Sequence, residues 1–350
     1  MNICDNIQKI NKKKCLKIII IILFDSYFLF LFNYKIISSP KISVFLPIYN
    51  KAKYLKRSIG SIQIQTLKKI EIIPVNDCSN DNSLEILKEM GKSDRRIKIV
   101  NNKKNGGLLY SRTMGILNSK GKYLMNLDPD DELNGSDSLE YLYNKAIEAN
   151  ADIVCFGFLK EIKSILTKQK IFKCKNYNQL LNHIQIHNYG HIINDFLITN
   201  KLVKKDIFLR AVQQFKHYIF GMKWNYGEDE IWSTLVYKHS NSLICINKII
   251  FIYHSNNDSL MNNRFNALFF SNIYNWLLFF IKTYKKKNEY VFLKRKIKDL
   301  IKLTNNKNFL ITMKNNKYLM NKYITILQNI ITNYKICVIS LQKIINSLKN

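Results

Sequence analysis

The chain has 350 residues, and 55 Lys and Arg residues against 25 Asp and Glu residues give a formal net charge of +30. Hydrophobic residues make up 47% of the sequence, which is enough to bury a core and excludes a chain that is disordered throughout. The seven cysteines form no CxxC pair, so the sequence argues against a Cys-based zinc site and against a disulfide framework.

The positive charge is unevenly distributed along the chain. Residues 265–350 have 16 cations and two acids, whereas residues 41–160 have 19 cations and 14 acids. Seven of the cations are Arg, the residue that reads phosphates and base edges better than Lys, so we expect no nucleic-acid partner. The abundance of Lys, Asn and Ile is typical of A/T-rich codon usage, which accounts for part of the basicity.

The first 40 residues combine lysines with an apolar run. Lys12, Lys13 and Lys14 precede residues 16–32, which are mostly Ile, Leu, Phe and Tyr. As a helix this run is about 25 Å long, slightly short of a hydrocarbon core of about 30 Å. It predicts a single-pass signal anchor with the rest of the chain on the luminal side of a membrane. The alternatives are a cleaved signal peptide, a buried or interfacial helix, and attachment at the cytoplasmic membrane face.

Residues 41–160 alternate short apolar runs with amphipathic segments. Strands are expected at 41–46, 70–75, 97–100 and 123–127, and helices at 54–64, 83–90 and 108–117. This alternation predicts an α/β fold with a Rossmann-like, doubly wound, mostly parallel sheet. Ligands bind such sheets beyond the carboxyl ends of the strands, and the polar clusters of this segment fall there.

An acidic cluster follows the last of these apolar runs, at Asp128-Pro129-Asp130-Asp131-Glu132. Carboxylates this close raise one another's pKa unless a cation lies among them. Oxygen ligands suit Mg²⁺ or Mn²⁺, which often bridge to substrate phosphates. Taken alone, an acidic loop that caps the helix expected near Ser136 explains the cluster equally well.

Five short motifs follow one another between residues 47 and 229. They are PIYN at 47–50, VNDCSND at 75–81, NGGLLYSRTMG at 105–115, LDPDD at 127–131 and GED at 227–229. Their order and spacing resemble those of the family 2 glycosyltransferases, which have the GT-A nucleotide-sugar-binding fold. The chain departs from the family pattern at Asn76, Cys78, Ser111 and Thr113, and Asn76 replaces an acid.

The resemblance implies a nucleotide-sugar donor, expected to be a UDP-sugar. Asp77 would accept the N3–H of a uracil ring, and Pro47 and Tyr49 would lie by the base or ribose. Arg112 would hold the nucleotide or its phosphates.

The resemblance also implies a divalent cation at the LDPDD motif. Asp128 and Asp130 would meet the ribose and the metal. Asp130 and Asp131 are the residues expected to hold Mn²⁺ or Mg²⁺. Of the two, Asp131 is the one expected to bind the ion directly.

The GED motif precedes apolar residues at helical spacing, so its acids are expected at a helix N-terminus, where the helix dipole favours ionised carboxylates. The resemblance makes Asp229 the catalytic base, with Glu228 as the second candidate. Simple N-capping is the structural alternative for Asp229. Trp224 and Trp232 flank these acids and would either stack on a sugar ring or pack in the core.

The implied reaction is one inverting displacement, of hexosyltransferase type, in which Asp229 removes the proton of an acceptor hydroxyl. The acceptor would be a glycan, a lipid-linked molecule or a protein. Two alternatives are an inactive nucleotide-sugar- or carbohydrate-binding protein on the same fold and a basic protein that binds membrane surfaces.

We therefore expect three regions: an anchor or signal at 1–40, a GT-A domain at 41–264 and a basic helical tail at 265–350. Within the domain, 41–160 would form the nucleotide-binding half and 161–264 the acceptor half. His183, His187 and His191 recur at helical spacing and favour a solvated or packed face over a metal site. His254 and Ser259, in a segment that resembles a late family strand, are candidates to touch the diphosphate or metal. The tail would lie on an anionic membrane or pack on the domain.

Overall fold

The computed structural model describes residues 39–162, 165–169, 181–182, 197–219 and 227–255, with a few isolated helical residues nearer the two ends. Apart from these isolated residues, the run at 16–32 and the tail at 265–350 lie outside the described ranges. So do Trp224, Ser259 and the three histidines at 183, 187 and 191, and the predictions made for them stay predictions. Among the helices that are described, none has the length and apolar character needed to cross a bilayer.

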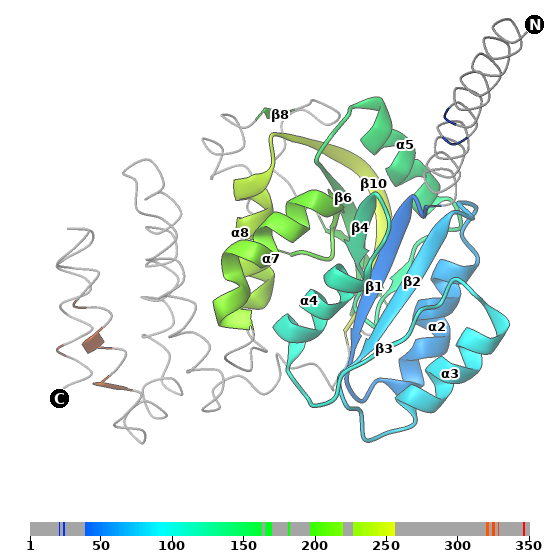
Figure 1. The fold of residues 1–350 in the computed structure, drawn as a ribbon, viewed down its shortest axis with the longest axis horizontal. Helices are drawn as coiled ribbons and strands as arrows, with labels where there is room; N and C mark the ends of the chain where they lie inside the picture. The colour runs from blue at the N-terminus through cyan, green and yellow to red at the C-terminus, as the bar shows by residue number, and fades with distance from the viewer. Residues whose placement is uncertain are drawn as a thin grey trace, which may run out of the picture.

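The described strands form one sheet in the order β3-β2-β1-β4-β9-β6-β10-β5. The first four strands in this order pair in parallel (Figure 1). They are β1 (Ile42–Ile48), β2 (Ile70–Asn76), β3 (Val100–Asn101) and β4 (Tyr123–Asn126). Each begins within a few residues of an expected strand, so the α/β fold with a parallel sheet is confirmed in this half.

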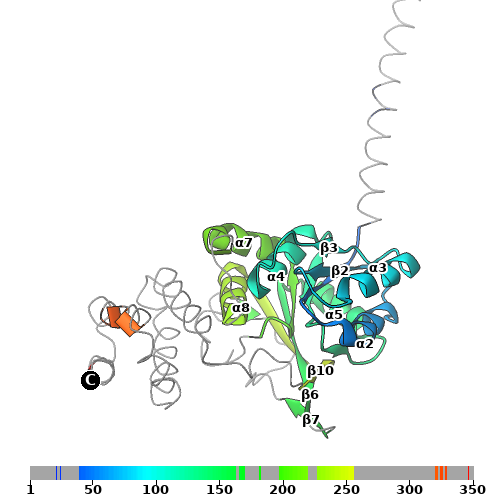
Figure 2. The same ribbon diagram turned by 90° about the horizontal axis from the view of Figure 1, so that it is seen from below.

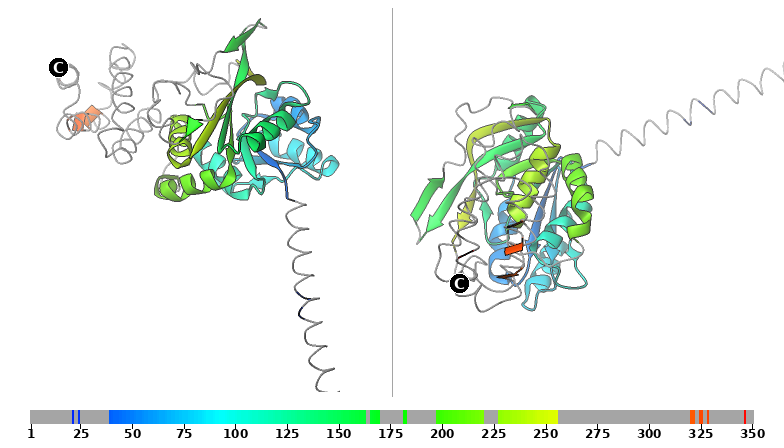
Figure 3. Two further views of the ribbon diagram at one scale, coloured as in Figure 1. Left: turned by 90° about the horizontal axis from the view of Figure 1, so that it is seen from above. Right: turned by 90° about the vertical axis from the view of Figure 1, so that its left-hand side faces the viewer.

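The second half of the sheet is mixed. β9 runs antiparallel to both of its neighbours, β4 and β6, while β6 and β10 run parallel to each other. The β6–β7 pair extends away from the rest of the sheet (Figure 3). These strands are β5 (Glu132–Leu133), β6 (Ile153–Ile162), β7 (Ile165–Gln169), β8 (Leu181–Asn182), β9 (Lys201–Lys204) and β10 (Ser242–His254).

Helices cover both faces of this sheet, with α4 and α7 on one side and α2 and α5 on the other (Figure 2). The described helices are α2 (Ala52–Gln63), α3 (Ser83–Ser93), α4 (Leu108–Asn118), α5 (Ser138–Glu148), α7 (Lys205–Ile219) and α8 (Glu228–His239). Two faces covered by helices explain why every residue of β1 is buried.

Alternate residues of β1 pack against the helices on the two sides of the sheet. Val44 and Leu46 belong to the core cluster that includes residues of α2 and α5. On the other side the Phe45 ring packs edge-on against Phe208 of α7, with 6.0 Å between ring centroids. Phe208 in turn packs against Trp232 of α8 at 5.9 Å, so β1 links the two halves of the chain through this aromatic row.

The third strand is shorter than the sequence predicts. Of the expected residues 97–100 only Val100 lies in β3, and Ile97 makes an isolated bridge with Ile72. β3 is the outer strand of the described sheet and pairs with β2 alone. An edge strand receives no ladder hydrogen bonds on its second side, which permits this interruption.

Two mid-helix glycines allow a matched test of the packing between α4 and β1. Gly115→Ala places a Cβ 2.8 Å from Cβ of Phe45, whereas a Cβ at Gly60 in α2 has no atom within 4 Å. Both changes gain helix propensity, so Gly60→Ala should raise the free energy of unfolding by about 0.5–1 kcal/mol. Gly115→Ala should lower it by about 1–3 kcal/mol because of overpacking. Urea denaturation of both variants checks this, and equal effects would contradict the described packing.

Candidate active site

The predicted motifs meet at one edge of the sheet. β1, β2 and β4 are parallel, so the residues that follow them lie at the same edge. Pro47 is buried within β1, Tyr49 follows it with 44% of its surface exposed, and Asp77 and Asp128 come directly after β2 and β4. Of the described residues at this edge, Tyr49 is the most open aromatic candidate for contact with a base.

Asp77 holds the loop that leads into α4. Its Oδ1 accepts hydrogen bonds from the Asn102 side chain at 2.8 Å and the Gly106 backbone N–H at 2.9 Å, and its Oδ2 accepts from the Gly107 N–H at 2.8 Å. The residue is 3% exposed. Asp77 therefore positions the NGG turn, and its contact with a uracil ring stays a prediction.

Asn76 and Ser111, two of the departures from the family pattern, make side-chain hydrogen bonds, but the backbone conformation at position 78 does not explain the Cys there. The Asn76 amide donates to Asn101 Oδ1 at 2.7 Å, a bond between β2 and β3 that an Asp in its place would be unable to donate. Cys78 has a φ of 57°, in the left-handed region that glycine adopts without strain. Ser111 accepts a hydrogen bond from Asn102 at 3.2 Å, which joins it to the Asp77 network.

Arg112 of α4 connects the two acidic motifs. Its Nη1 donates to Asp229 Oδ1 at 2.5 Å and to Glu228 Oε1 at 3.1 Å, and its Nη2 donates to Asp128 Oδ1 at 3.1 Å. The Arg112 side chain is 1% exposed. Asp128 thus shares one buried guanidinium with Glu228 and Asp229, which lie about a hundred positions later in the chain. The contact of Arg112 with phosphates stays a prediction.

Burial and mutual repulsion shift the pKa values in this cluster. Burial raises the pKa of Glu228 to about 8, with the Asp229 charge adding to the effect. Burial, and then Asp229 and Asp130, likewise raise the pKa of Asp128 despite its contact with Arg112. Burial lowers the pKa of Arg112, but the three carboxylates outweigh it and hold the pKa above its usual value.

Asp130 and Asp131 have different partners. Asp130 Oδ2 accepts from the Lys51 ammonium at 2.7 Å, and Arg57 of α2 donates to the Asp130 carbonyl at 2.5 Å. Asp131 Oδ1 accepts from the His254 backbone N–H at 3.0 Å, while its buried Oδ2 has no hydrogen-bond partner in the described part of the chain. Burial, then Asp128 and Asp130, hold the pKa of Asp131 well above its usual value.

These carboxylates do not form a ready metal cage. Within the described ranges, no group of three or more His, Cys, Asp or Glu residues is placed to hold a metal ion. The His254 ring lies between two other acids, with Nε2 at 2.9 Å from Glu132 Oε1 and Nδ1 in contact with Glu161. A contact of His254 with diphosphate or metal stays a prediction.

The two acids at the start of α8 differ in exposure. The Asp229 side chain is 30% exposed and the Glu228 side chain 7%. Gly227, with a φ of 77°, precedes them as the N-cap residue, so both lie in the first turn of the helix. Trp232 is fully buried and contacts Phe208, so its role is core packing and not sugar stacking.

Sequence reasoning missed three residues of this site. Lys51 and Arg57 contact Asp130, and Asn102 contacts Asp77, although none of them belongs to a quoted motif. Lys51 directly follows the PIYN motif, which is the one local signal that was available. Its pairing with Asp130, 79 positions away, depends on the fold.

The fold and the site define an α/β protein of the doubly wound type with an acidic site at the carboxyl ends of its strands. The model of the family described as glycosyl transferase family 2 matches residues 43–209. Glycosyltransferase GlyG of Streptococcus pneumoniae is 30% identical over 234 residues, which cover 65% of this chain and 75% of GlyG. The chain therefore belongs to family 2 of the glycosyltransferases.

Two further comparisons extend this result. The chain is 39% identical over 135 residues to cholesterol galactosyltransferase of Borreliella burgdorferi, covering 39% of this chain and 37% of that protein. A crystal structure of S. aureus TarS 1-349 in complex with UDP-GlcNAc is similar in fold, with a TM-score of 0.63 and 15% identity. That alignment covers 88% of this chain and 89% of the TarS chain.

We expect Asp77→Asn to destabilise the folded chain without any ligand. The amide nitrogen would face one of the two backbone N–H groups that the carboxylate now satisfies, and a buried unsatisfied donor costs about 1–3 kcal/mol. Urea denaturation measures the loss, with Asp206→Asn, 62% exposed, as the control. A stability equal to that of the control would contradict the loop-holding role.

The pH dependence of stability tests the buried state of Glu228. With a pKa raised from 4.5 to about 8, folded Glu228 keeps a proton that the unfolded chain releases. Its contribution to stability is therefore lost as pH rises from about 4.5 to about 8. Glu228→Gln lacks this titration, so its stability relative to the parent should increase across that window, measured by urea denaturation with a chelator.

Glu148→Gln is the matched control for this experiment because the Glu148 side chain is 68% exposed. If the difference between the Glu228→Gln variant and the parent stays constant with pH, Glu228 is not held protonated in the folded chain.

Proposed function

We propose that the chain transfers a sugar from a nucleotide-diphosphate donor, a UDP-sugar, to a hydroxyl acceptor with inversion at the anomeric carbon. The chain's family membership supports sugar transfer in general. The shared fold supports a UDP-sugar donor, because TarS was solved with UDP-GlcNAc and with UDP.

The observation that carries the proposal is the link through Arg112. It holds Asp229, the more exposed acid of the GED motif, beside Asp128, the first acid of the LDPDD motif. A displacement reaction needs a base on one side of the sugar carbon and stabilisation of the leaving group on the other. Arg112 fixes the expected base, Asp229, relative to the LDPDD loop, which is expected to stabilise the leaving group.

Asp229 has the exposure and bonding expected of the base. Arg112 occupies its Oδ1, and in the described part of the chain no group binds its Oδ2. In the proposed reaction this oxygen accepts the proton of an acceptor hydroxyl, whose oxygen then forms the bond to the anomeric carbon as the nucleoside diphosphate departs. Glu228 is 7% exposed against 30% for Asp229, so we assign Glu228 to the positioning of Arg112 and Asp229 to the role of base.

The acids of the LDPDD loop fit a divalent cation in their chemistry. Asp131 keeps a buried carboxylate oxygen without a partner among the described residues, and burial, followed by the charges of Asp128 and Asp130, raises its pKa. A bound cation would relieve that repulsion. Asp130 and Asp131 would hold Mn²⁺ or Mg²⁺, beside Asp128, and the ion would compete with Lys51 for Asp130. When bound, such an ion stabilises negative charge on the leaving diphosphate.

Substitution of the base tests the mechanism. Asp229→Asn should lower the rate of sugar transfer by about 10²- to 10⁴-fold, because the amide accepts no proton. The measurement screens UDP-sugars for metal-dependent transfer or donor hydrolysis and compares the variant with the parent. Donor binding, followed by calorimetry, should change little.

Asp206→Asn, an exposed acid at the start of α7, is the control and should keep full activity. Transfer unchanged in Asp229→Asn would remove Asp229 as the base. Binding of a UDP-sugar without turnover in the parent would favour the inactive binding protein instead.

A further inference from the structure

A pocket runs along the β3 side of the sheet, from the beginnings of β1 and β2 to Val100, which pairs with Val75. It has a volume of about 510 Å³ and is lined by residues at the beginnings of β1 and β2 and by the segments that follow α3 and α4. Glu71, at the far end of this pocket, lies six positions before Asp77, which corresponds to about 20 Å of extended chain. A volume of this size is in the range of small-molecule sites.

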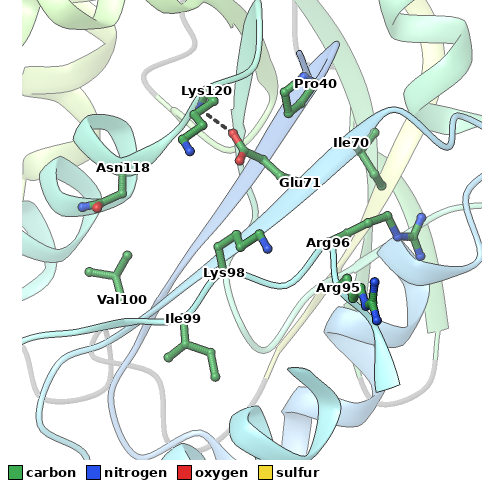
Figure 4. Close-up of a pocket in the computed structure, with 10 residues that line it drawn as sticks. All are labelled: Pro40, Ile70, Glu71, Arg95, Arg96, Lys98, Ile99, Val100, Asn118 and Lys120. Carbon is green, nitrogen blue, oxygen red and sulfur yellow. Dashed lines mark hydrogen bonds between the residues drawn. The ribbon is translucent and has the colours of Figure 1, made fainter. Parts of the chain in front are cut away.

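The lining of this pocket is strongly basic (Figure 4). Arg95, Arg96, Lys98 and Lys120 line it against one acid, Glu71, and Lys98 extends across it toward Arg96. Arg95 and Arg96 are adjacent, although the chain has only seven arginines. A/T-rich codon usage enriches lysine and not arginine, so it does not explain this pair.

The one acid of the pocket is already engaged. Glu71 is 5% exposed, and its Oε1 accepts hydrogen bonds from the Ser43 hydroxyl at 2.6 Å and the Gly121 N–H at 3.1 Å, and from the backbone N–H of Lys120. It therefore serves the fold by joining β1, β2 and the segment after α4. In the described residues the side chains of Arg95, Lys98 and Lys120 form no ion pair, and all three are exposed.

Arg96 is held rigidly at the rim. Its Nε and Nη2 donate to the Asp94 carboxylate, at 2.7 Å from Nη2 to Oδ2, and Nη2 also donates to the Gln63 carbonyl. Its Nη1 has no hydrogen-bond partner among the described residues. A guanidinium fixed in this way loses little entropy when it binds an anion.

The pocket also lies where the chain enters the domain. Pro40 lines it and lies eight positions after Phe32, the end of the apolar run. Fully extended, eight residues span at most about 28 Å. An apolar run inserted in a membrane would therefore keep this pocket within about 28 Å of the end of the run.

We propose that this pocket binds the phosphate of an anionic lipid headgroup and holds the amino-terminal edge of the sheet against a membrane. The charge of the pocket is complementary to a phosphodiester, and a lysine or arginine near an anionic surface contributes about 1 kcal/mol to binding. The proposal rests on the charge and position of the pocket lining. Insertion of residues 16–32 would bring the pocket to the headgroups but is not required, and the proposed reaction is not involved.

Co-flotation of the full chain with vesicles tests the proposal. The variant Arg95→Gln/Lys98→Gln/Lys120→Gln is compared with Lys56→Gln/Lys88→Gln/Lys216→Gln, which removes the same charge from exposed positions elsewhere. The gain in partitioning when phosphatidylglycerol is added to phosphatidylcholine vesicles should fall on the order of 100-fold in the pocket variant. The control should keep most of its binding, and Lys98→Gln alone should show part of the loss.

Three results would overturn the proposal: no loss in the pocket variant, an equal loss in the control, or an equal loss on vesicles of phosphatidylcholine alone. Inorganic phosphate is tested in the same way. If it stabilises the parent but not the pocket variant, while vesicle binding is the same in both, the site binds a soluble anion instead. Hydrolysis of the donor in detergent should be the same in the parent, the pocket variant and the control variant. This measurement separates a failure of the lipid-binding proposal from a failure of the proposed sugar transfer.

Discussion

The contact of Arg112 with three carboxylates is the interaction on which the site depends. The guanidinium is almost fully buried, and its partners come from the loop after β4 and from the first turn of α8. A buried ion pair contributes little net stability, but a buried charge that loses its partners is strongly unfavourable. The cluster therefore specifies how α4, α8 and the LDPDD loop fit together more than it stabilises the fold.

The same cluster explains the electrostatic character of the site. One guanidinium faces Asp128, Glu228 and Asp229, and the neighbouring Asp131 retains a buried oxygen without a partner among the described residues. Burial, and after it the excess negative charge, raises the pKa values of Asp128, Glu228 and Asp131. Such an arrangement is suited to a positively charged ligand, because binding relieves repulsion already present in the folded chain.

The sequence was sufficient to predict the parallel half of the fold and the edge where the motifs meet. Periodicity located β1, β2 and β4, and the rule that ligands bind beyond the carboxyl ends of parallel strands placed Asp77 and Asp128 together. The pairing of Lys51 with Asp130 was not predictable, since it depends on how α2 lies over a loop 79 positions later. Trp232 was ambiguous because core packing and sugar stacking produce the same local pattern.

The place of β9 in the sheet has a consequence for how the chain holds together. This strand, from residues 201–204, lies between β4 and β6 and bonds to both. Residues assigned to the acceptor half thus supply the strand that covers the edge of the nucleotide-binding half. The two halves are interleaved, so they share one cooperative unit and the acceptor side is unable to swing as a hinged lobe without breaking backbone hydrogen bonds. A fragment that ended near residue 160 would expose the side of β4 as an unpaired edge, the kind of surface that promotes aggregation.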